Sequence, residues 1–274
     1  MTVNEPDYGR AGRNLPVAIA VGLGLFATVI ASLFIDTRFF AILAAFGMML
    51  AARELGRTLV VGLSERMSIL LQILSPAIIV GAAIGGPVGL LGTFVASSLL
   101  VLAVRLLDGQ EAYVHHVTRS IYALAYAPLL AGFAVLLSTQ ENGAWKVLAF
   151  ILLTAGTDLG GYATGAIFGK HPMAPNISPN KSWEGFAGAL ILQLIVGVAL
   201  WVYVFEQPWW QGAIVGFVMM LTATIGDLVE SMIKRDVGIK DMGGLLPGHG
   251  GVMDRLDSLV VNAFMAWLLF GFFL

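Results

Sequence analysis

Two short patterns in the second half of the chain place pairs of carboxylates at helical spacing. The stretch DLVES contains Asp227 and Glu230, and the stretch DRLDS contains Asp254 and Asp257. In each stretch the acids stand three residues apart and a serine follows directly, so one helical face carries all three groups. Two acidic faces repel each other unless a cation lies between them. Because the donors are all oxygens, we expect a hard ion, with Mg²⁺ as the first candidate.

The alternative is that these acids form structural ion pairs with nearby bases, namely Lys234, Arg235 and Arg255. Asp227 comes seven residues before Lys234, which places it about 10 Å inside the end of its helix at 1.5 Å per residue. A carboxylate at that depth is costly in lipid and normally requires a polar cavity or a charged partner. Asp158, inside the apolar segment that ends in TDLGGYATGAIFGKH, has the same requirement.

Glycines and bases gather around the second acid pair in a pattern typical of phosphate binding. Gly250 and Gly251 let backbone N–H groups approach an anion with no side chain in the way. His249 either donates to a phosphate or leaving group or is an ordinary turn histidine. Further donors are expected on the same side of the membrane: Lys234, Arg235, Lys240, Arg255, Ser178, Lys181 and Ser182. Carboxylates for a metal beside donors for phosphate indicate a site for a nucleotide polyphosphate.

The composition indicates what kind of fold must position these groups. Of the 274 residues, 58% are hydrophobic and 12% are charged, whereas a soluble domain usually carries about 25% charged residues. This contrast predicts an integral membrane protein, with the lipid bilayer as its surroundings. The net charge of −2 provides no basic field for a nucleic acid. The absence of cysteine excludes zinc–thiolate sites and thiol nucleophiles.

We expect an all-α, polytopic fold, because lipid-exposed backbone must satisfy its own hydrogen bonds. A spanning helix needs about 20 apolar residues. The apolar runs predict about nine spans, of which the second and third are short: 16–35, 38–52, 68–84, 86–104, 119–138, 145–168, 185–205, 211–233 and 258–274. Residues 1–144 then form transmembrane helices with few motifs, and residues 145–274 form a C-terminal catalytic region that carries the polar motifs.

The distribution of bases predicts the orientation in the membrane. With the N-terminus in the cytoplasm, 13 of the 15 Lys and Arg residues fall on the cytoplasmic side. Only Arg38 and Lys146 fall on the opposite side. We therefore expect the polar segments 169–184 and 234–257 to face the cytoplasm and the C-terminus to face away from it.

Missing motifs exclude several other chemistries. The chain contains no GxxxxGK[ST], no GxSxG and no HExxH, so it has no P-loop, nucleophile elbow or zinc-protease helix.

A cation-coupled membrane transporter is a further alternative, in which Asp158, Asp227 and Glu230 would be intramembrane ion sites. The acids cluster toward one membrane face and no inverted repeat is visible, which favours an enzyme.

The segment SMIKRDVGIKDMGGLLPGHGGVMDRLDS closely resembles the signature of the phosphatidate cytidylyltransferases, also called CDP-diacylglycerol synthases. The matching positions are Ser231, Lys234, Arg235, Lys240, Asp241, 247–251, Asp254, Arg255 and Asp257. The upstream stretches DLGGYATGAIFGKH and ISPNKSWEG resemble two further family segments. Gly161 there replaces a more usual Ala, and Ser182 a more usual Thr. The resemblance in motifs covers about residues 157–258, and the first half matches only as a helical membrane protein.

The resemblance implies that CTP and phosphatidate react to give CDP-diacylglycerol and pyrophosphate. It also implies Mg²⁺ in a two-cation site whose second ion can be monovalent, with Asp227 and Asp254 at the matching positions. A homodimer in a bacterial inner membrane, with its active site facing the cytoplasm, is expected. The alternative within this chemistry is another CTP-dependent lipid enzyme, such as a polyprenol kinase or an archaeal lipid cytidylyltransferase.

Three sets of roles follow from the motifs and the resemblance together. The catalytic set is Asp227, Asp254, Lys240, Asp241, His249 and Arg255. The substrate-binding set is Asp158, Ser178, Lys181, Glu184, Lys234, Arg235, Gly250 and Gly251. The metal-binding set is Asp227, Asp254, Glu230 and Asp257.

Overall fold

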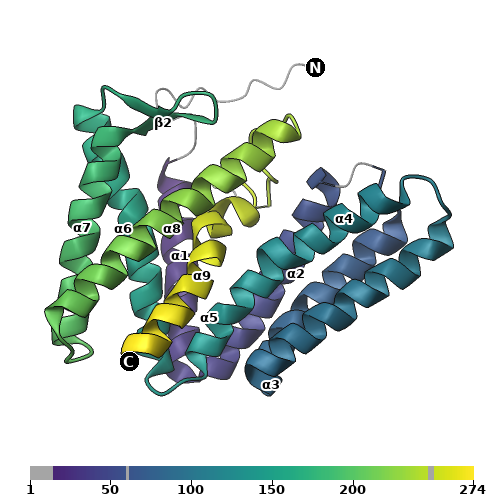
Figure 1. Cartoon of the computed structure of the whole chain (residues 1–274), viewed down its shortest axis with the longest axis horizontal. Helices are drawn as coiled ribbons and strands as arrows, with labels where there is room; N and C mark the ends of the chain where they lie inside the picture. The colour runs from purple at the N-terminus through teal and green to yellow at the C-terminus, as the bar shows by residue number, and fades with distance from the viewer. Residues whose placement is uncertain (1–14, 60–61, 246–249) are drawn as a thin grey trace.

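The computed structural model describes residues 15–59, 62–245 and 250–274, and it is a bundle of long apolar helices with a small β-hairpin at one end (Figure 1). Seven helical segments in those ranges are long and apolar enough to cross a membrane. The all-α, polytopic membrane fold is thereby confirmed. The exception is the antiparallel pair of β1 (Pro172–Ala174) and β2 (Ser178–Ser182).

The first two helices of the described residues, α1 (Leu15–Ile35) and α2 (Thr37–Leu59), pack against each other. Asp36 separates them, and its Oδ1 accepts the backbone N–H of Arg38 at 2.8 Å. Such a bond satisfies one of the N–H groups that have no partner in the first turn of a helix. The second helix is longer than the expected span 38–52, and its last turns carry Glu54 and two arginines toward the end of the bundle where the hairpin lies.

α3 (Glu65–Arg105) is two helices folded against each other. As one straight helix its 41 residues would measure about 61 Å, roughly twice the hydrocarbon core of a bilayer. Gly86 interrupts it with a φ of 59°, a value that residues with a side chain rarely adopt. The two arms then touch, because a Cβ on Gly89 would lie 2.2 Å from the carbonyl oxygen of Gly81. These arms correspond to the expected spans 68–84 and 86–104.

One further span of the first half is made of three pieces. The short helix η2 (Leu106–Asp108) leads to α4 (Tyr113–Leu124), a π-helical turn η3 (Ala125–Leu129) and α5 (Leu130–Ser138). Pro128 lies in the π-helical turn, where its missing N–H prevents a regular hydrogen-bond ladder. α5 packs against α9, so the two halves of the chain share one core.

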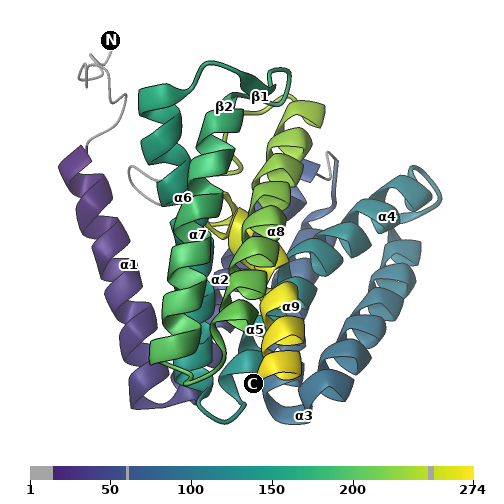
Figure 2. The ribbon, with the colours of Figure 1, turned by 60° about the vertical axis from the view of Figure 1, so that its left-hand side comes forward.

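The second half contains α6 (Gly143–Phe168), α7 (Trp183–Tyr203), α8 (Trp209–Asp236) and α9 (Met253–Phe273). Close packing of α7 on α8 depends on glycine, since a Cβ on Gly197 would lie 2.3 Å from the carbonyl oxygen of Gly212. The β-hairpin joins α6 to α7, and residues 237–252 join α8 to α9. The hairpin and the described residues of the second connection, 237–245 and 250–252, lie at one end of the bundle, and the C-terminus lies at the other (Figures 1 and 2).

With α1 included, α3 counted as two arms and α4 to α5 as one span, the helices follow the order of the expected spans. The number that crosses a bilayer stays a prediction, as does the division at residue 144.

Candidate active site

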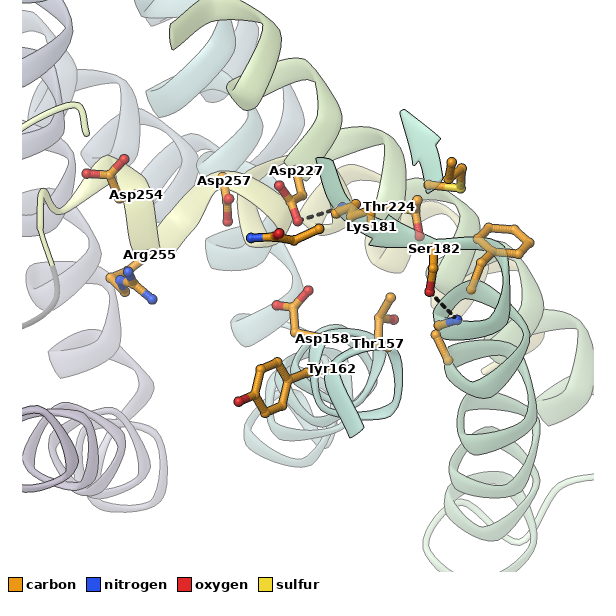
Figure 3. A pocket seen from close by; sticks show the side chains of 16 residues that line it. Thr157, Asp158, Tyr162, Lys181, Ser182, Thr224, Asp227, Asp254, Arg255 and Asp257 are labelled. Atoms are coloured by element: carbon orange, nitrogen blue, oxygen red, sulfur yellow. Dashed lines mark hydrogen bonds and ion pairs between the residues drawn. The ribbon is translucent and has the colours of Figure 1, made fainter. Parts of the chain in front are cut away.

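A cavity of about 490 Å³ lies at the end of the bundle where the β-hairpin sits. Its walls come from α6, the hairpin, α7, α8 and α9. Its charged lining residues are Asp158, Asp227, Asp254, Asp257, Lys181 and Arg255. In Figure 3 the side chains of Asp158, Asp227 and Asp257 point into the same space, and Asp254 lies farther along, at the start of α9. The fold therefore gathers acids from three helices around one space, which we call the acidic cavity.

Hydrogen bonds around the start of α7 hold the hairpin over the acidic cavity. Ser182 caps the helix, since its Oγ accepts the N–H of Gly185 at 3.1 Å. Glu184, in the first turn, accepts the backbone N–H groups of Lys170 and His171 at 3.1 and 3.2 Å. Its Oε1 also lies 2.5 Å from Nδ1 of His171. Glu184 thus ties the hairpin to α7, and its expected contact with substrate stays a prediction.

Two lysines pair with the acids of the stretches DLVES and DRLDS. Lys181 Nζ lies 2.6 Å from Oδ2 of Asp227. Lys234 Nζ lies 3.1 Å from Oδ1 of Asp254, and the same ammonium group also pairs with the buried Glu230. Lys234 was among the expected partners of the acids. Lys181 was not, because a pair between the hairpin and α8 has no signature in sequence spacing.

Asp254 also binds the backbone of the connection between α8 and α9. Its Oδ2 accepts the N–H of Gly251 at 2.8 Å and that of Met242 at 3.0 Å, and its Oδ1 lies 3.1 Å from the same Met242 nitrogen. The side chain is only 4% exposed. Gly250, with a φ of 85°, turns the chain beside it. One carboxylate therefore joins both ends of the connection to Lys234.

Several expected site residues lie outside the wall of the acidic cavity. Arg235 is exposed, and its Nε donates to a backbone carbonyl of the hairpin turn at 3.4 Å. Ser178 begins β2, and Lys240 and Asp241 are exposed in the connection between α8 and α9. His249 lies outside the described residues. What these residues bind stays a prediction.

The donors of the acidic cavity fit a hard divalent cation. Asp158, Asp227 and Asp257 present carboxylate oxygens to one space, and Mg²⁺ binds oxygen ligands. Within residues 15–59, 62–245 and 250–274, no three Asp, Glu or His side chains already converge closely enough to hold a metal ion. In this arrangement Lys181 engages one oxygen of Asp227. The predicted metal-binding set therefore stays a prediction.

Other residues that line the acidic cavity did not emerge from the sequence. Thr157 and Tyr162 flank Asp158, and Thr224 precedes Asp227 by one helical turn. Helical spacing around the two acids would have identified Tyr162 and Thr224, but not Thr157, which directly precedes Asp158.

Glu54 of α2 was also missed. It is 5% exposed and hydrogen-bonds to the start of α9. No spacing rule connects two segments so far apart in sequence.

Fold and cavity together define a polytopic membrane protein with a charged site at one end of its helical bundle. Residues 16–273 match the model of the cytidylyltransferase family. The phosphatidate cytidylyltransferase of Mycobacterium leprae is 39% identical over 97% of this chain and 89% of that protein. The one of Mycobacterium tuberculosis is 37% identical over 96% and 84%, and the one of Staphylococcus saprophyticus is 37% identical over 62% and 65%.

The chain belongs to the cytidylyltransferase family. It is a nucleotidyltransferase of the membrane.

Proposed function

We propose that the chain transfers the cytidylyl group of CTP to phosphatidate, which gives CDP-diacylglycerol and pyrophosphate. A phosphate oxygen of the lipid bonds to the α-phosphorus of CTP, and the bond from that phosphorus to the pyrophosphate oxygen breaks. The observation that carries the proposal is the acidic cavity, where Asp158, Asp227 and Asp257 lie beside Lys181 and Arg255. With cations on its carboxylates, a cavity that also presents two bases would suit the meeting of two polyanions.

The bases of the acidic cavity provide donors for phosphate oxygens. Lys181 reaches it from the hairpin and Arg255 from α9. Charge-assisted hydrogen bonds from such groups are stronger than neutral ones, and arginine can bind a phosphate with two parallel N–H groups. Donors fixed in place also stabilise the negative charge that moves onto the leaving pyrophosphate. No side chain needs to remove a proton, because a phosphomonoester with a second pKa of about 6 is already largely dianionic at neutral pH.

We also propose Mg²⁺ as the cofactor, held by Asp227, Asp254 and Asp257 of the predicted metal-binding set together with Asp158, which was expected in the substrate-binding set. Glu230, the fourth expected ligand, is not part of the cavity wall and pairs with Lys234. When bound, it supplies charge neutralisation to the phosphates. A second cation, which can be monovalent, is proposed on the same group of acids. This assignment is supported by the carboxylates of Asp158, Asp227 and Asp257, which point into the same space.

The proposed location is a bacterial inner membrane, with the acidic cavity facing the cytoplasm. The distribution of bases supports this orientation, because cytoplasmic segments of membrane proteins carry an excess of Lys and Arg. At the cavity end of the bundle, helix ends and connections carry Arg53, Arg57, Lys181 and Lys234. This side gives access to soluble CTP, and lipid can arrive from the bilayer. A homodimer is proposed on the family resemblance.

Three alternatives predict different outcomes. A polyprenol kinase would release CDP from CTP rather than pyrophosphate, and an archaeal lipid cytidylyltransferase would prefer a different lipid phosphate. A cation-coupled transporter would move ions in sealed vesicles without consuming CTP. Family membership and the bases in the acidic cavity favour the transferase.

The test is turnover by the purified chain in mixed micelles. Radiolabelled CTP with phosphatidate should give labelled lipid and pyrophosphate in equal amounts. ATP, GTP and UTP should be poor substitutes, as should a polyprenol or an ether-linked lipid phosphate. Absence of labelled lipid with phosphatidate, together with CDP release or CTP-independent ion flux, would reject the proposal.

A further inference from the structure

Glu54 lies in the half of the chain that carries few motifs, yet its carboxylate contacts the catalytic half. We propose that Glu54 is a positioning residue: it holds the two described ends of the connection between α8 and α9, residues 242–243 and 251–253, and so places the start of α9 at the acidic cavity. This inference deepens the proposed function, on which its activity readout rests. Its structural readout does not depend on that function.

The first support is a pair of hydrogen bonds to the start of α9. Oε1 of Glu54 accepts the N–H of Val252 at 3.0 Å, and Oε2 accepts the N–H of Met253 at 2.9 Å. These N–H groups belong to the first turn of a helix, where no intrahelical partner exists. A carboxylate is also favoured there by the partial positive charge of the helix end. Glu54 therefore replaces the side-chain cap that α9 itself lacks.

The second support is the close fit of glycines around the carboxylate. A Cβ on Gly243 would lie 2.4 Å from Oε1 of Glu54, and a Cβ on Gly251 would lie 2.7 Å from Oε2. These two glycines lie on the two ends of the connection, on either side of the residues outside the described ranges. Glu54 thus contacts both ends at once. A side chain at either glycine would displace the carboxylate.

The third support is the link from Glu54 to the cavity wall. Asp254 accepts N–H groups of Met242 and Gly251, so it binds the same two short segments that Glu54 contacts. Arg255 lines the acidic cavity one residue farther along α9. If Glu54 releases the start of α9, both of these cavity residues lose their support. α2 touches the connection a second time, where Thr58 Oγ1 lies 3.7 Å from the sulfur of Met242.

The bonding pattern requires two acceptors at this position. Glutamine at position 54 has the same shape but offers one carbonyl oxygen and one NH₂ group. Its NH₂ group would face a backbone N–H, so one of the two bonds would be lost and two donors would oppose each other. Leucine would remove both bonds. The loss should therefore increase from Glu54→Gln to Glu54→Leu.

The experiment compares these two variants with two controls in the same detergent. Glu65→Gln changes an exposed glutamate at the same end of the bundle, and Met48→Ala leaves a hole beneath the buried face of α2. Three quantities are measured: amide hydrogen exchange of residues 250–256, thermal unfolding, and kcat and KM with CTP and phosphatidate. Exchange should accelerate at Val252 and Met253 in the Glu54 variants and should stay unchanged in both controls.

The Glu54 variants with faster amide hydrogen exchange should also have lower kcat/KM. Because hydrogen bonds to a charged group are lost, we expect kcat/KM per folded protein to fall about tenfold in Glu54→Gln and about a hundredfold in Glu54→Leu. Met48→Ala should lower the unfolding temperature without this loss in the folded fraction. A merely stabilising role for Glu54 would give the reverse: a lower unfolding temperature and unchanged kcat/KM.

Failure of this inference and failure of the proposed function give different results. Wild-type exchange and wild-type kcat/KM in Glu54→Leu would overturn the inference while the activity stands. The same accelerated exchange in Met48→Ala would also overturn it, because the effect would then be general loosening. If the wild type does not consume CTP and phosphatidate, the proposed function fails, and the exchange data alone decide whether Glu54 holds the connection.

Discussion

Lys181 Nζ lies 2.6 Å from Oδ2 of Asp227, so an ion pair joins the β-hairpin to α8 across the acidic cavity (Figure 3). The hairpin contributes a base to a site whose acids come from helices. A cation bound to Asp227 would compete with this pair and leave the ammonium group of Lys181 available for a phosphate. The pair is therefore a point where metal binding and nucleotide binding would influence each other.

Replacing Lys181 with methionine tests the role of this base. Lys181→Met keeps the aliphatic length and removes the charge, and a hydrogen bond to a charged group contributes about 1.5–3 kcal/mol. We therefore expect KM for CTP to rise at least about tenfold, with little change in thermal unfolding, since the half-buried pair contributes modestly to stability. Steady-state kinetics at several CTP concentrations provide the measurement. An unchanged KM would show that Lys181 serves only to hold the hairpin.

Asp254→Asn should affect stability more than a change at Asp227 does. The Asp254 carboxylate binds two backbone N–H groups and Lys234 while nearly fully buried. An asparagine loses one acceptor and the negative charge, which we expect to cost about 2–4 kcal/mol of folding free energy. Thermal unfolding in detergent measures this loss. A variant as stable as the wild type would mean that Asp254 does not anchor the connection.

Two bases of the signature should matter more than a base at the other end of the bundle. Arg255 lines the acidic cavity, and Lys240 is exposed in the connection between α8 and α9. Arg255→Ala and Lys240→Ala are expected to lower kcat/KM for CTP by about tenfold or more, because each removes a charge opposite a polyanion. Arg38→Ala is the control, since Arg38 is exposed at the start of α2. Equal kinetic effects from all three variants would mean that the site is misplaced.

Single cysteines test the orientation in this cysteine-free chain. Asn176→Cys and Gly244→Cys place thiols at exposed positions of the two connections at the cavity end, and a Cβ on Gly244 has no atom within 4 Å. Both should react with an impermeant maleimide only from the cytoplasmic side. Glu141→Cys, between α5 and α6, should react only from the opposite side. Labelling of Gly244→Cys in intact cells from outside would reverse the predicted topology.

Much of the fold could be predicted because lipid imposes simple rules on the sequence. Apolar runs of helical length marked the helices, and the boundary between the expected spans 68–84 and 86–104 coincides with the place where α3 folds back. The length of α2 was underestimated, because the expected span 38–52 stopped where the charged residues Arg53 and Glu54 begin. The small β-hairpin was missed, since strands of three and five residues leave too little alternation to detect.

The site, like the fold, was predicted only in part. Local spacing identified Asp227 in the stretch DLVES and Asp254 with Asp257 in the stretch DRLDS, because each stretch places its acids on one helical face. It could not identify the pairing of Lys181 with Asp227 or the contact of Glu54 with α9, since both depend on helices meeting in space. Such contacts follow from the packing of the whole chain rather than from any one segment.

The most direct measurement is turnover, Mg²⁺ dependence and thermal unfolding of Asp227→Asn on a single preparation, beside the wild type. The asparagine keeps the shape of the side chain and removes one negative charge from the acidic cavity. If Asp227 holds Mg²⁺ beside the phosphates, turnover of CTP and phosphatidate should fall by about a hundredfold or more, with a raised Mg²⁺ requirement and an unfolding temperature close to that of the wild type. An unstable protein whose folded fraction keeps normal turnover and normal Mg²⁺ dependence would contradict the account.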